Sequence, residues 1–288
     1  MTKRSTLLLV SGVFAGFFLI GDFYVLKDDS AFNDREYTKT YKVDDVKIFV
    51  INLDKSRDRW DKLEPLVQRS GIEYERISGV LGAALSDQEK ESIVDRSQYN
   101  RIMSIPADNG SIGCYMSHIK VWKEFLKSQY KYAIVMEDDV TFDPAKFANV
   151  VSSIKAHTFG EWDIISFNLA HDGWPVHIHN ISGTEHSLVK YRRRVSLTGC
   201  YMITRSGAIK LLKKALPIKM PVDYYFVRSW ELGTTFYGVE PRMVHQCDAE
   251  SEIAGQKAKV SRNEWWLLAI SVINQAKTDI MTFVHSFR

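Results

Sequence analysis

The chain has 288 residues, of which 45% are hydrophobic and 25% are charged, and its formal net charge is +3. This composition is that of a globular protein long enough to bury a core, and it has no basic block of the kind that binds nucleic acid. The three cysteines, Cys114, Cys200 and Cys247, have neither metal-binding nor redox spacing. They allow one disulfide at most, which excludes a fold built on disulfides.

The N-terminus carries a mainly apolar segment. Lys3 and Arg4 precede a run from Leu7 to Leu26 that is interrupted at Asp22. This run reaches the length that a bilayer-spanning helix needs, and no small-residue cleavage site follows it. We therefore expect residues 1–26 to form a cytoplasmic tip and a membrane anchor, with a cleaved signal peptide or a buried helix as the alternatives.

The charges around this segment predict its orientation. Positive residues precede it and the acidic sequence KDD follows it, so the N-terminus should stay cytoplasmic in a single-pass type II arrangement. The bulk of the chain would then face the Golgi or ER lumen in a eukaryotic host, and the anchor would lie in the inner membrane of a bacterial one. Residues 27–46 are polar and charged, which is typical of a stem between anchor and domain.

From Lys47 onward, strand-like and helix-like segments alternate over about 200 residues, which favours a mainly parallel α/β domain. Ser86 and Glu89 have the spacing of a capping box, and Ser111 opens the longest helical stretch. The predicted strands are 47–53, 72–77, 132–136, 162–169 and 196–204, and the predicted helices are 58–69, 111–129 and 205–216.

Three carboxylates, Glu137, Asp138 and Asp139, follow the buried strand YAIVM. A solvated turn is the simplest interpretation, but ligands of open parallel sheets bind beyond the carboxyl ends of the strands. The segment after the first strand, INLDKSRDR, offers Arg57 and Arg59 to a phosphate-bearing ligand. Mg²⁺ or Mn²⁺ commonly bridges protein carboxylates and a diphosphate. On an extended backbone, Glu137 and Asp139 can face one side while Asp138 faces away.

Five segments, in order, resemble the pattern of glycosyltransferase family 25. They are INLDKSRDRW (51–60), SIGCYMSHIKVW (111–122), VMEDDV (135–140), LTGCYMITRSGAIKLL (197–212) and PVDYYF (221–226), within a similarity that covers roughly residues 47–252. That family includes lipooligosaccharide galactosyltransferases and the collagen galactosyltransferase domain. The resemblance implies a GT-A-type fold and an inverting transfer from a UDP-sugar, usually galactose, with a divalent metal at the acidic motif. Ser111 departs from the pattern, because an acidic residue is more usual there.

The resemblance also implies which residues form the site. Asp139 is the first expected metal ligand, with Asp138 and His245 beside it, although His245 can equally be a histidine without a ligand role. Ser117 and His118 are either nucleotide-site or packing residues. The full set expected to bind the donor is Asn52, Arg57, Arg59, Ser117, His118, Glu137, Asp138 and Gln246.

Asp223 interrupts the aromatic segment PVDYYF. An inverting transfer needs a base that takes the proton of the attacking hydroxyl, and we expect Asp223 to fill that role. Carboxylates that hold a cation are poor bases, which speaks against Glu137, Asp138 and Asp139. Capping of a helix, or contact with the acceptor or the sugar, are the alternatives for Asp223.

We therefore predict a membrane-anchored, Mn²⁺- or Mg²⁺-dependent enzyme that moves a hexose from a UDP-sugar to a glycan or protein-linked hydroxyl. The catalytic domain is expected at 47–255, followed by a helical segment at 256–288 that either packs on it or contacts the membrane interface. Two rivals remain: a metal-dependent phosphohydrolase with the same carboxylates, and a catalytically silent glycan-binding or chaperone-like module.

Overall fold

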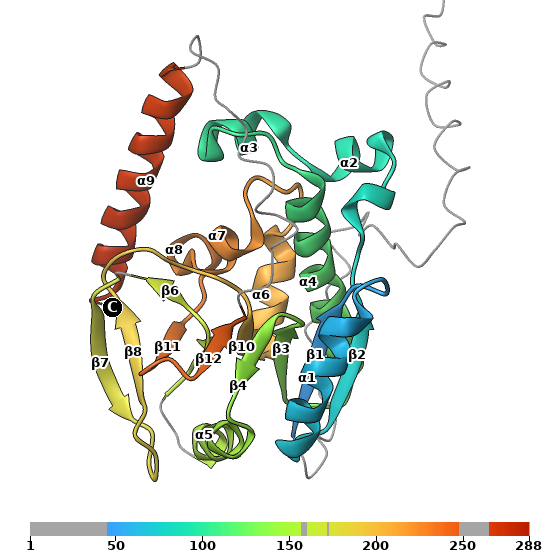
Figure 1. Ribbon diagram of the computed structural model, residues 1–288. Helices are drawn as coiled ribbons and strands as arrows, with labels where there is room; N and C mark the ends of the chain where they lie inside the picture. The colour runs from blue at the N-terminus through green and yellow to red at the C-terminus, as the bar shows by residue number, and fades with distance from the viewer. Residues whose placement is uncertain (1–44, 157–159, 172, 248–264, 288) are drawn as a thin grey trace, which may run out of the picture. The chain divides into compact units, whose positions relative to one another are not determined.

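An eight-stranded mixed sheet occupies the centre of the computed structural model, which describes residues 45–156, 160–171, 173–247 and 265–287 (Figure 1). The predicted anchor, 1–26, and residues 27–44 of the predicted stem lie outside the described residues. Among the helices that the structure describes, none has both the length and the apolar character needed to span a membrane.

The strand order of the sheet is β2-β1-β3-β10-β5-β11-β8-β7. Strands β2, β1, β3, β5, β11 and β7 share one direction, and β10 and β8 run against them. The predicted α/β class is therefore right, and the correction is that an antiparallel strand, β10, separates β3 from β5. The bounds are β1 (Val46–Asn52), β2 (Tyr74–Ser78), β3 (Tyr132–Glu137), β5 (Ile164–Ser166), β7 (Pro175–Asn180), β8 (Ser187–Tyr191), β10 (Cys200–Thr204) and β11 (Phe236–Glu240).

Two short two-stranded sheets lie beside the main one. Strand β4 (Val140–Phe142) pairs with β12 (Val244–Gln246), which brings a late segment of the chain next to the acidic motif. Strand β6 (Ala170–His171) pairs with β9 (Val195–Ser196).

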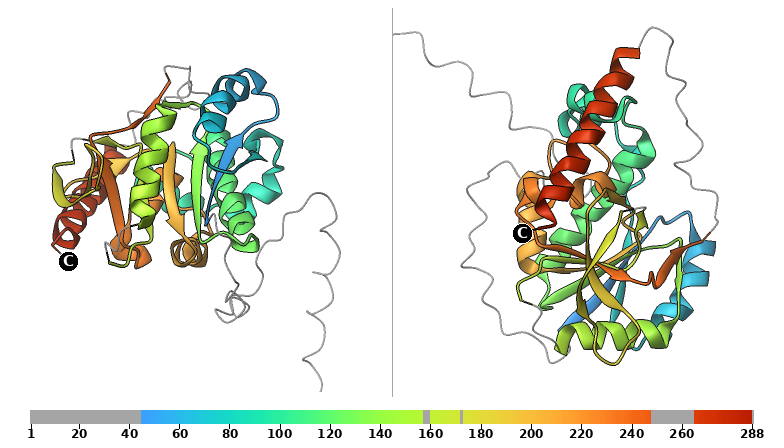
Figure 2. Two further views of the ribbon diagram at one scale, coloured as in Figure 1. Left: turned by 90° about the horizontal axis from the view of Figure 1, so that it is seen from below. Right: turned by 90° about the vertical axis from the view of Figure 1, so that its left-hand side faces the viewer.

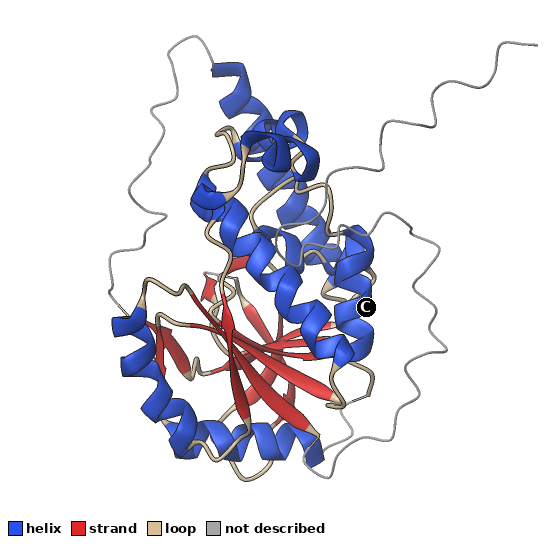
Figure 3. Ribbon diagram, turned by 90° about the vertical axis from the view of Figure 1, so that its right-hand side faces the viewer, coloured by secondary structure: helices blue, strands red, loops and turns tan. Residues whose placement is uncertain are grey.

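Helices cover both faces of the sheet (Figure 3). Helices α1 and α5 lie on one face, and Figure 2 shows α1 and α4 on opposite sides of β1. Alternation along β1 explains this, since Ile48 and Val50 enter the core under α1 and α5, whereas Phe49 contacts Phe125 of α4. The bounds are α1 (Arg57–Arg69), η2 (Gly82–Ala84), α2 (Asp87–Ile93), α3 (Arg96–Met103), α4 (Asn109–Lys127), α5 (Pro144–Ala156), α6 (Arg205–Lys214), α7 (Val222–Phe226), α8 (Ser229–Leu232) and α9 (Trp265–His285).

Several predicted boundaries are corrected by local contacts. The long helix begins at Asn109 instead of Ser111, because Asp108 is the residue whose side chain caps it and accepts from the Ser111 N–H at 2.7 Å. The predicted strand 196–204 is interrupted at Leu197, whose φ of 81° is left-handed, so only Cys200–Thr204 joins the main sheet. The predicted capping box between Ser86 and Glu89 is confirmed.

The predicted C-terminal helix is confirmed as α9, which is red in Figures 1 and 2 and contacts α3 and α8. Asp279 accepts from Arg194 Nε at 2.9 Å, and Asn274 donates to the carbonyl of Arg101 at 2.8 Å. One side of α9 thus packs on the domain, and packing on the domain is one of the two alternatives that the sequence predicts for this segment. Its other side exposes large apolar side chains, namely Val272, Ile273, Ile280, Phe283 and Val284.

Candidate active site

A cavity of about 310 Å³ opens at the carboxyl ends of β1 and β3, beside the N-terminal half of α4. The acidic motif, Glu137–Asp139, forms part of its wall, together with Arg59, Ser117, His118 and Gln246 from the predicted donor site. Two glycines let α4 approach the loop before α2. A Cβ atom on Gly113 would lie 2.5 Å from the carbonyl oxygen of Val80, which leaves no room for a side chain.

Asp138 is held by its own protein neighbours. Asn52 Nδ2 donates to Asp138 Oδ2 at 2.6 Å, and Arg59 NH1 lies 3.4 Å from Asp138 Oδ1. Burial raises the pKa of Asp138, and the bonds from Asn52 and Arg59 oppose that rise. The acidic motif is thereby held to β1 and α1, and Asp138 lines the same cavity as Glu137 and Asp139. The predicted opposite direction of Asp138 assumed an extended backbone, whereas Asp138 and Asp139 lie in a turn that follows β3.

Asn52 has a structural place in this arrangement. Its side chain is buried, donates to the carbonyl of Ser56 at 2.9 Å and accepts from Arg76 Nε at 2.7 Å. It does not line the cavity, and neither does the exposed Arg57. Direct contact of these two residues with the donor stays a prediction. In the structure, the Asn52 side chain instead positions Asp138 through its hydrogen bond to the carboxylate.

Glu137 accepts two short hydrogen bonds. Thr198 Oγ1 donates to Glu137 Oε1 at 2.6 Å, and His118 Nε2 lies 3.2 Å from the same oxygen. Burial raises the pKa of Glu137, but the bonds from His118 and Thr198 outweigh it and hold the pKa below its usual value. Glu137 is therefore an ionised acceptor deep in the site.

This ionised state determines the tautomer of His118, which is fully buried. An ionised carboxylate can only accept, so Nε2 of His118 must carry a proton toward Glu137. The Tyr201 hydroxyl lies 3.0 Å from His118 Nδ1 and accepts from the indole N–H of Trp122 at 2.7 Å. A continuous chain of hydrogen bonds thus runs from Trp122 to Glu137. Ser117, beside it, bonds the Val80 N–H and the Gly113 carbonyl.

Asp139 is different, because one of its oxygens has no partner. Gln246 Nε2 donates to Oδ2 at 2.8 Å, whereas Oδ1 is buried without a hydrogen bond from any described residue. Burial, followed by repulsion from Glu137, raises the pKa of Asp139 to about 6. A buried carboxylate oxygen without a donor, next to a second carboxylate, is a place where a cation is stabilising. Oxygen ligands of this kind fit Mg²⁺ or Mn²⁺.

Asp223 lies in the first turn of α7 and belongs to the same electrostatic neighbourhood. Burial raises its pKa to about 6, repulsion from Glu137 adds to the rise, and hydrogen bonds from the backbone of Tyr224 and Leu197 oppose it. The left-handed Leu197 and the adjacent Thr198 therefore link Asp223 and Glu137 through one short segment. Pro221 is the N-cap residue, so the predicted alternative of a helix cap is not the role of Asp223.

His245 lies on β12 next to Gln246, and both side chains are exposed. Neighbouring residues of a strand face opposite sides, so with Gln246 bonded to Asp139 the His245 side chain faces elsewhere. It is not among the residues that line the cavity. Its role as a metal ligand stays a prediction, one that the cavity geometry does not favour.

Sequence reasoning missed Thr198, Tyr201 and Trp122, which complete the hydrogen-bond chain, and Cys114, which lines the cavity. The first three are remote from the acidic motif in sequence, so no local spacing connects them to it. Cys114 did leave a signal, because it lies four residues before His118 and hence on the same face of the helix.

Comparisons with known proteins agree on one family. The model of Glycosyltransferase family 25 (LPS biosynthesis protein) matches residues 45–226. A relative from Drosophila melanogaster, named Glycosyltransferase 25 family member, is 30% identical over 191 residues, which cover 62% of this chain and 30% of the relative. Procollagen galactosyltransferase 2 of Homo sapiens is 33% identical over 102 residues, covering 33% of this chain and 16% of the relative. The chain thus spans about a third or less of the length of these curated relatives.

Proposed function

We propose, from the premise that this chain belongs to glycosyltransferase family 25, that it transfers a hexose from a UDP-sugar to a hydroxyl group of a glycan or glycoprotein. Galactose is our first choice, because the relatives from Homo sapiens and Danio rerio are named procollagen galactosyltransferases. The observation that carries the proposal is the buried Oδ1 of Asp139, which has no hydrogen-bond partner among the residues that the structure describes and lies beside Glu137 in the wall of the cavity.

The cavity supports a nucleotide-sugar donor. Its volume of about 310 Å³ lies at the lower end of the range for ligand pockets. Asp139 would hold a divalent cation through its free oxygen, and that cation would neutralise the charge of the departing diphosphate. Arg59 lies at the same wall, where its guanidinium can approach a phosphate while it remains in contact with Asp138. We further propose that the mixed sheet is of the GT-A type.

Asp223 is our candidate for the base. Its raised pKa, about 6, lies near neutrality, where a carboxylate is both largely ionised and basic enough to take a proton. Its hydrogen bond from the backbone of Leu197 fixes its carboxylate next to the segment that also holds Glu137. In direct displacement, Asp223 would take the proton of the acceptor hydroxyl while that oxygen attacks the sugar carbon.

The location of the protein also belongs to this proposal. We propose a single-pass type II anchor within residues 1–26 on the sequence pattern alone. The apolar exposed side of α9 is a second surface that supports association with a membrane.

The test combines a donor screen with a product assay. The full chain is mixed with UDP-galactose, UDP-glucose or GDP-mannose, each with Mn²⁺ and with a chelator, and thermal shift and free UDP are measured. We expect a metal-dependent stabilisation by one UDP-sugar, and transfer when an acceptor glycan is supplied. Binding without turnover would support the silent module instead, and release of phosphate from the nucleotide would support the phosphohydrolase.

A further inference from the structure

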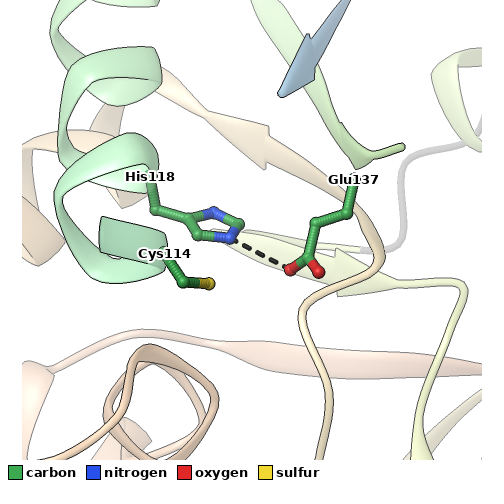
Figure 4. Close-up of side chains that lie close together, drawn as sticks. All are labelled: Cys114, His118 and Glu137. Carbon is green, nitrogen blue, oxygen red and sulfur yellow. Dashed lines mark hydrogen bonds and ion pairs between the residues drawn. The ribbon is translucent and has the colours of Figure 1, made fainter. Parts of the chain in front are cut away.

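Cys114, His118 and Glu137 converge on one point at the wall of the cavity (Figure 4). One potential ligand atom from each of them lies within 4.8 Å of the others. Cys114 and His118 are four residues apart on α4 and therefore share a face of that helix, while Glu137 ends β3. Two rigid elements thus bring a sulfur, a nitrogen and an oxygen together.

This donor set differs in chemistry from the one at Asp139. Thiolate, imidazole and carboxylate are the three ligand types that Zn²⁺ takes in proteins, whereas oxygen atoms alone suit Mg²⁺ and Mn²⁺. One thiolate and one carboxylate together balance the two charges of the cation, so the occupied site is electrically neutral. Without a cation, burial and the charge of Glu137 raise the pKa of the Cys114 thiol well above its usual value.

The surroundings supply the remaining requirements of such a site. Ligand atoms in a tetrahedral zinc site lie about 3.5 Å apart, and the three atoms here lie within 4.8 Å of one another, so each pair needs to close by about 1.3 Å at most. Tyr201, 3.0 Å from His118 Nδ1, is placed to orient the imidazole when Nε2 is the ligand atom. All three residues line the cavity, so a fourth position is open to water.

We propose that Cys114, His118 and Glu137 bind a thiophilic divalent cation of the zinc class, with a ligand set that does not include Asp139. Binding replaces the S–H bond of Cys114 with a sulfur–metal bond and releases that proton to solvent. The metal takes the place of the Nε2 proton of His118, which passes to Nδ1; Nδ1–H then donates a hydrogen bond to the Tyr201 oxygen, and the Tyr201 O–H turns away from Nδ1. The inference stands on geometry and does not depend on the proposed transferase activity.

Cobalt is the probe for this site, because Co²⁺ replaces Zn²⁺ and absorbs in the near ultraviolet when a thiolate is its ligand. One equivalent of Co²⁺ is added to the full chain and the absorption spectrum is recorded. We expect a thiolate-to-cobalt band that one equivalent of Zn²⁺ abolishes and that excess Mg²⁺ leaves unchanged.

Matched variants identify the ligands. Cys114→Ser, which is nearly isosteric, should lose the band at an unchanged melting temperature, whereas Cys247→Ser, the other cysteine that is not buried, should keep it. Asp139→Ala should keep the band as well, since the ligand set does not include Asp139. The proposal is overturned if wild type shows no band, if Cys114→Ser retains it, or if Asp139→Ala loses it.

Discussion

The three consecutive carboxylates Glu137, Asp138 and Asp139 have different hydrogen-bond partners, and this difference determines what each can do in the site. Asp138 bonds Asn52 and Arg59, Glu137 bonds His118 and Thr198, and Asp139 keeps one buried oxygen without a partner among the described residues. Asp138 thus positions the acidic motif on β1 and α1, and Glu137 belongs to the cluster with His118 and Cys114. Asp139 keeps an oxygen that a divalent cation could bind beside a diphosphate.

Replacement of Asp139 by Ala should abolish transfer and leave the fold intact. Loss of a metal ligand at a diphosphate costs on the order of several kcal/mol of transition-state stabilisation. The pKa of Asp139 is raised to about 6, so its charge destabilises the fold at neutral pH and its removal should not lower the melting temperature. Asp61→Ala, at an exposed carboxylate in the middle of α1, is the control. Undiminished transfer by Asp139→Ala would contradict the metal assignment.

Asp223→Asn should separate stability from turnover. Its folded pKa, about 6, lies above the ordinary value of 3.8, so the wild type loses stability as the pH rises through that interval. The variant should therefore melt at or above the wild-type temperature at pH 7.5, and the difference should vanish below pH 3.8. Turnover should fall by about 10²-fold or more, while UDP-sugar affinity stays near wild type. A parallel collapse of donor affinity would instead place Asp223 in the donor site.

Tyr201→Phe tests the buried hydrogen-bond chain. The change removes the hydroxyl that accepts from Trp122 and bonds His118 Nδ1, and it leaves both ring nitrogens buried without that partner. We expect the free energy of unfolding to fall by about 1–3 kcal/mol in urea denaturation. Tyr132→Phe, on the stacked and half-buried Tyr132, should change it little. If the two changes lowered the free energy of unfolding equally, the hydrogen-bond chain from Trp122 to Glu137 would not be stabilising the fold.

At the scale of elements, the site depends on how closely α4 approaches the loop that contains η2. Gly82 and Gly113 face each other across this contact, where a Cβ atom on Gly113 would lie 2.7 Å from the Gly82 nitrogen. Both segments line the cavity, so a small separation of the two would change its shape. The site also depends on the pairing of β12 with β4, because this pairing places Gln246 within hydrogen-bond distance of Asp139.

Gly113→Ala should therefore weaken both stability and donor binding. The added methyl group meets backbone atoms, which cannot rotate away, and overpacking of this kind costs about 1–3 kcal/mol. Thermal melting and a UDP titration with Mn²⁺ measure the two effects. Asn109→Ala, at the exposed start of the same helix, is the control for stability. A Gly113→Ala protein with unchanged melting and UDP affinity would show that the contact tolerates a side chain.

At the scale of the whole molecule, the proposal of membrane association rests on two apolar parts of the chain. One is the sequence from Leu7 to Leu26, which lies outside the described residues, and the other is the exposed side of α9. They differ in kind, since a spanning segment holds a protein far more firmly than a helix lying in the interface.

Membrane fractionation of two chains distinguishes these surfaces. The full chain should remain in the membrane pellet after an alkaline wash, whereas a chain beginning at Asp45 should be recovered in the supernatant. The shorter chain keeps the contacts of Asp45 with Lys131, Tyr132 and Lys155, so its thermal transition should persist. If the shorter chain also pellets while folded, α9 is the surface that binds the membrane.

The sequence by itself determined the α/β class of the fold and the position of the acidic motif at the end of a strand, and seven of the 19 residues that line the cavity were among the predicted site residues. Buried strands and amphipathic helices leave periodic patterns, and polar residues after a strand mark the edge where ligands bind, so local information was sufficient.

Only the tertiary structure decided which of these residues share a site and what each one does there. The antiparallel position of β10 brings Thr198 and Tyr201 to Glu137 and His118, and no pattern within β10 specifies its neighbours. Asn52 positions Asp138, and Asp139 keeps an oxygen without a partner among the described residues. This difference likewise depends on hydrogen bonds between residues far apart in the chain. The physical reason is that burial, repulsion and hydrogen-bond partners are properties of the packed neighbourhood, and that neighbourhood exists only once distant segments have met.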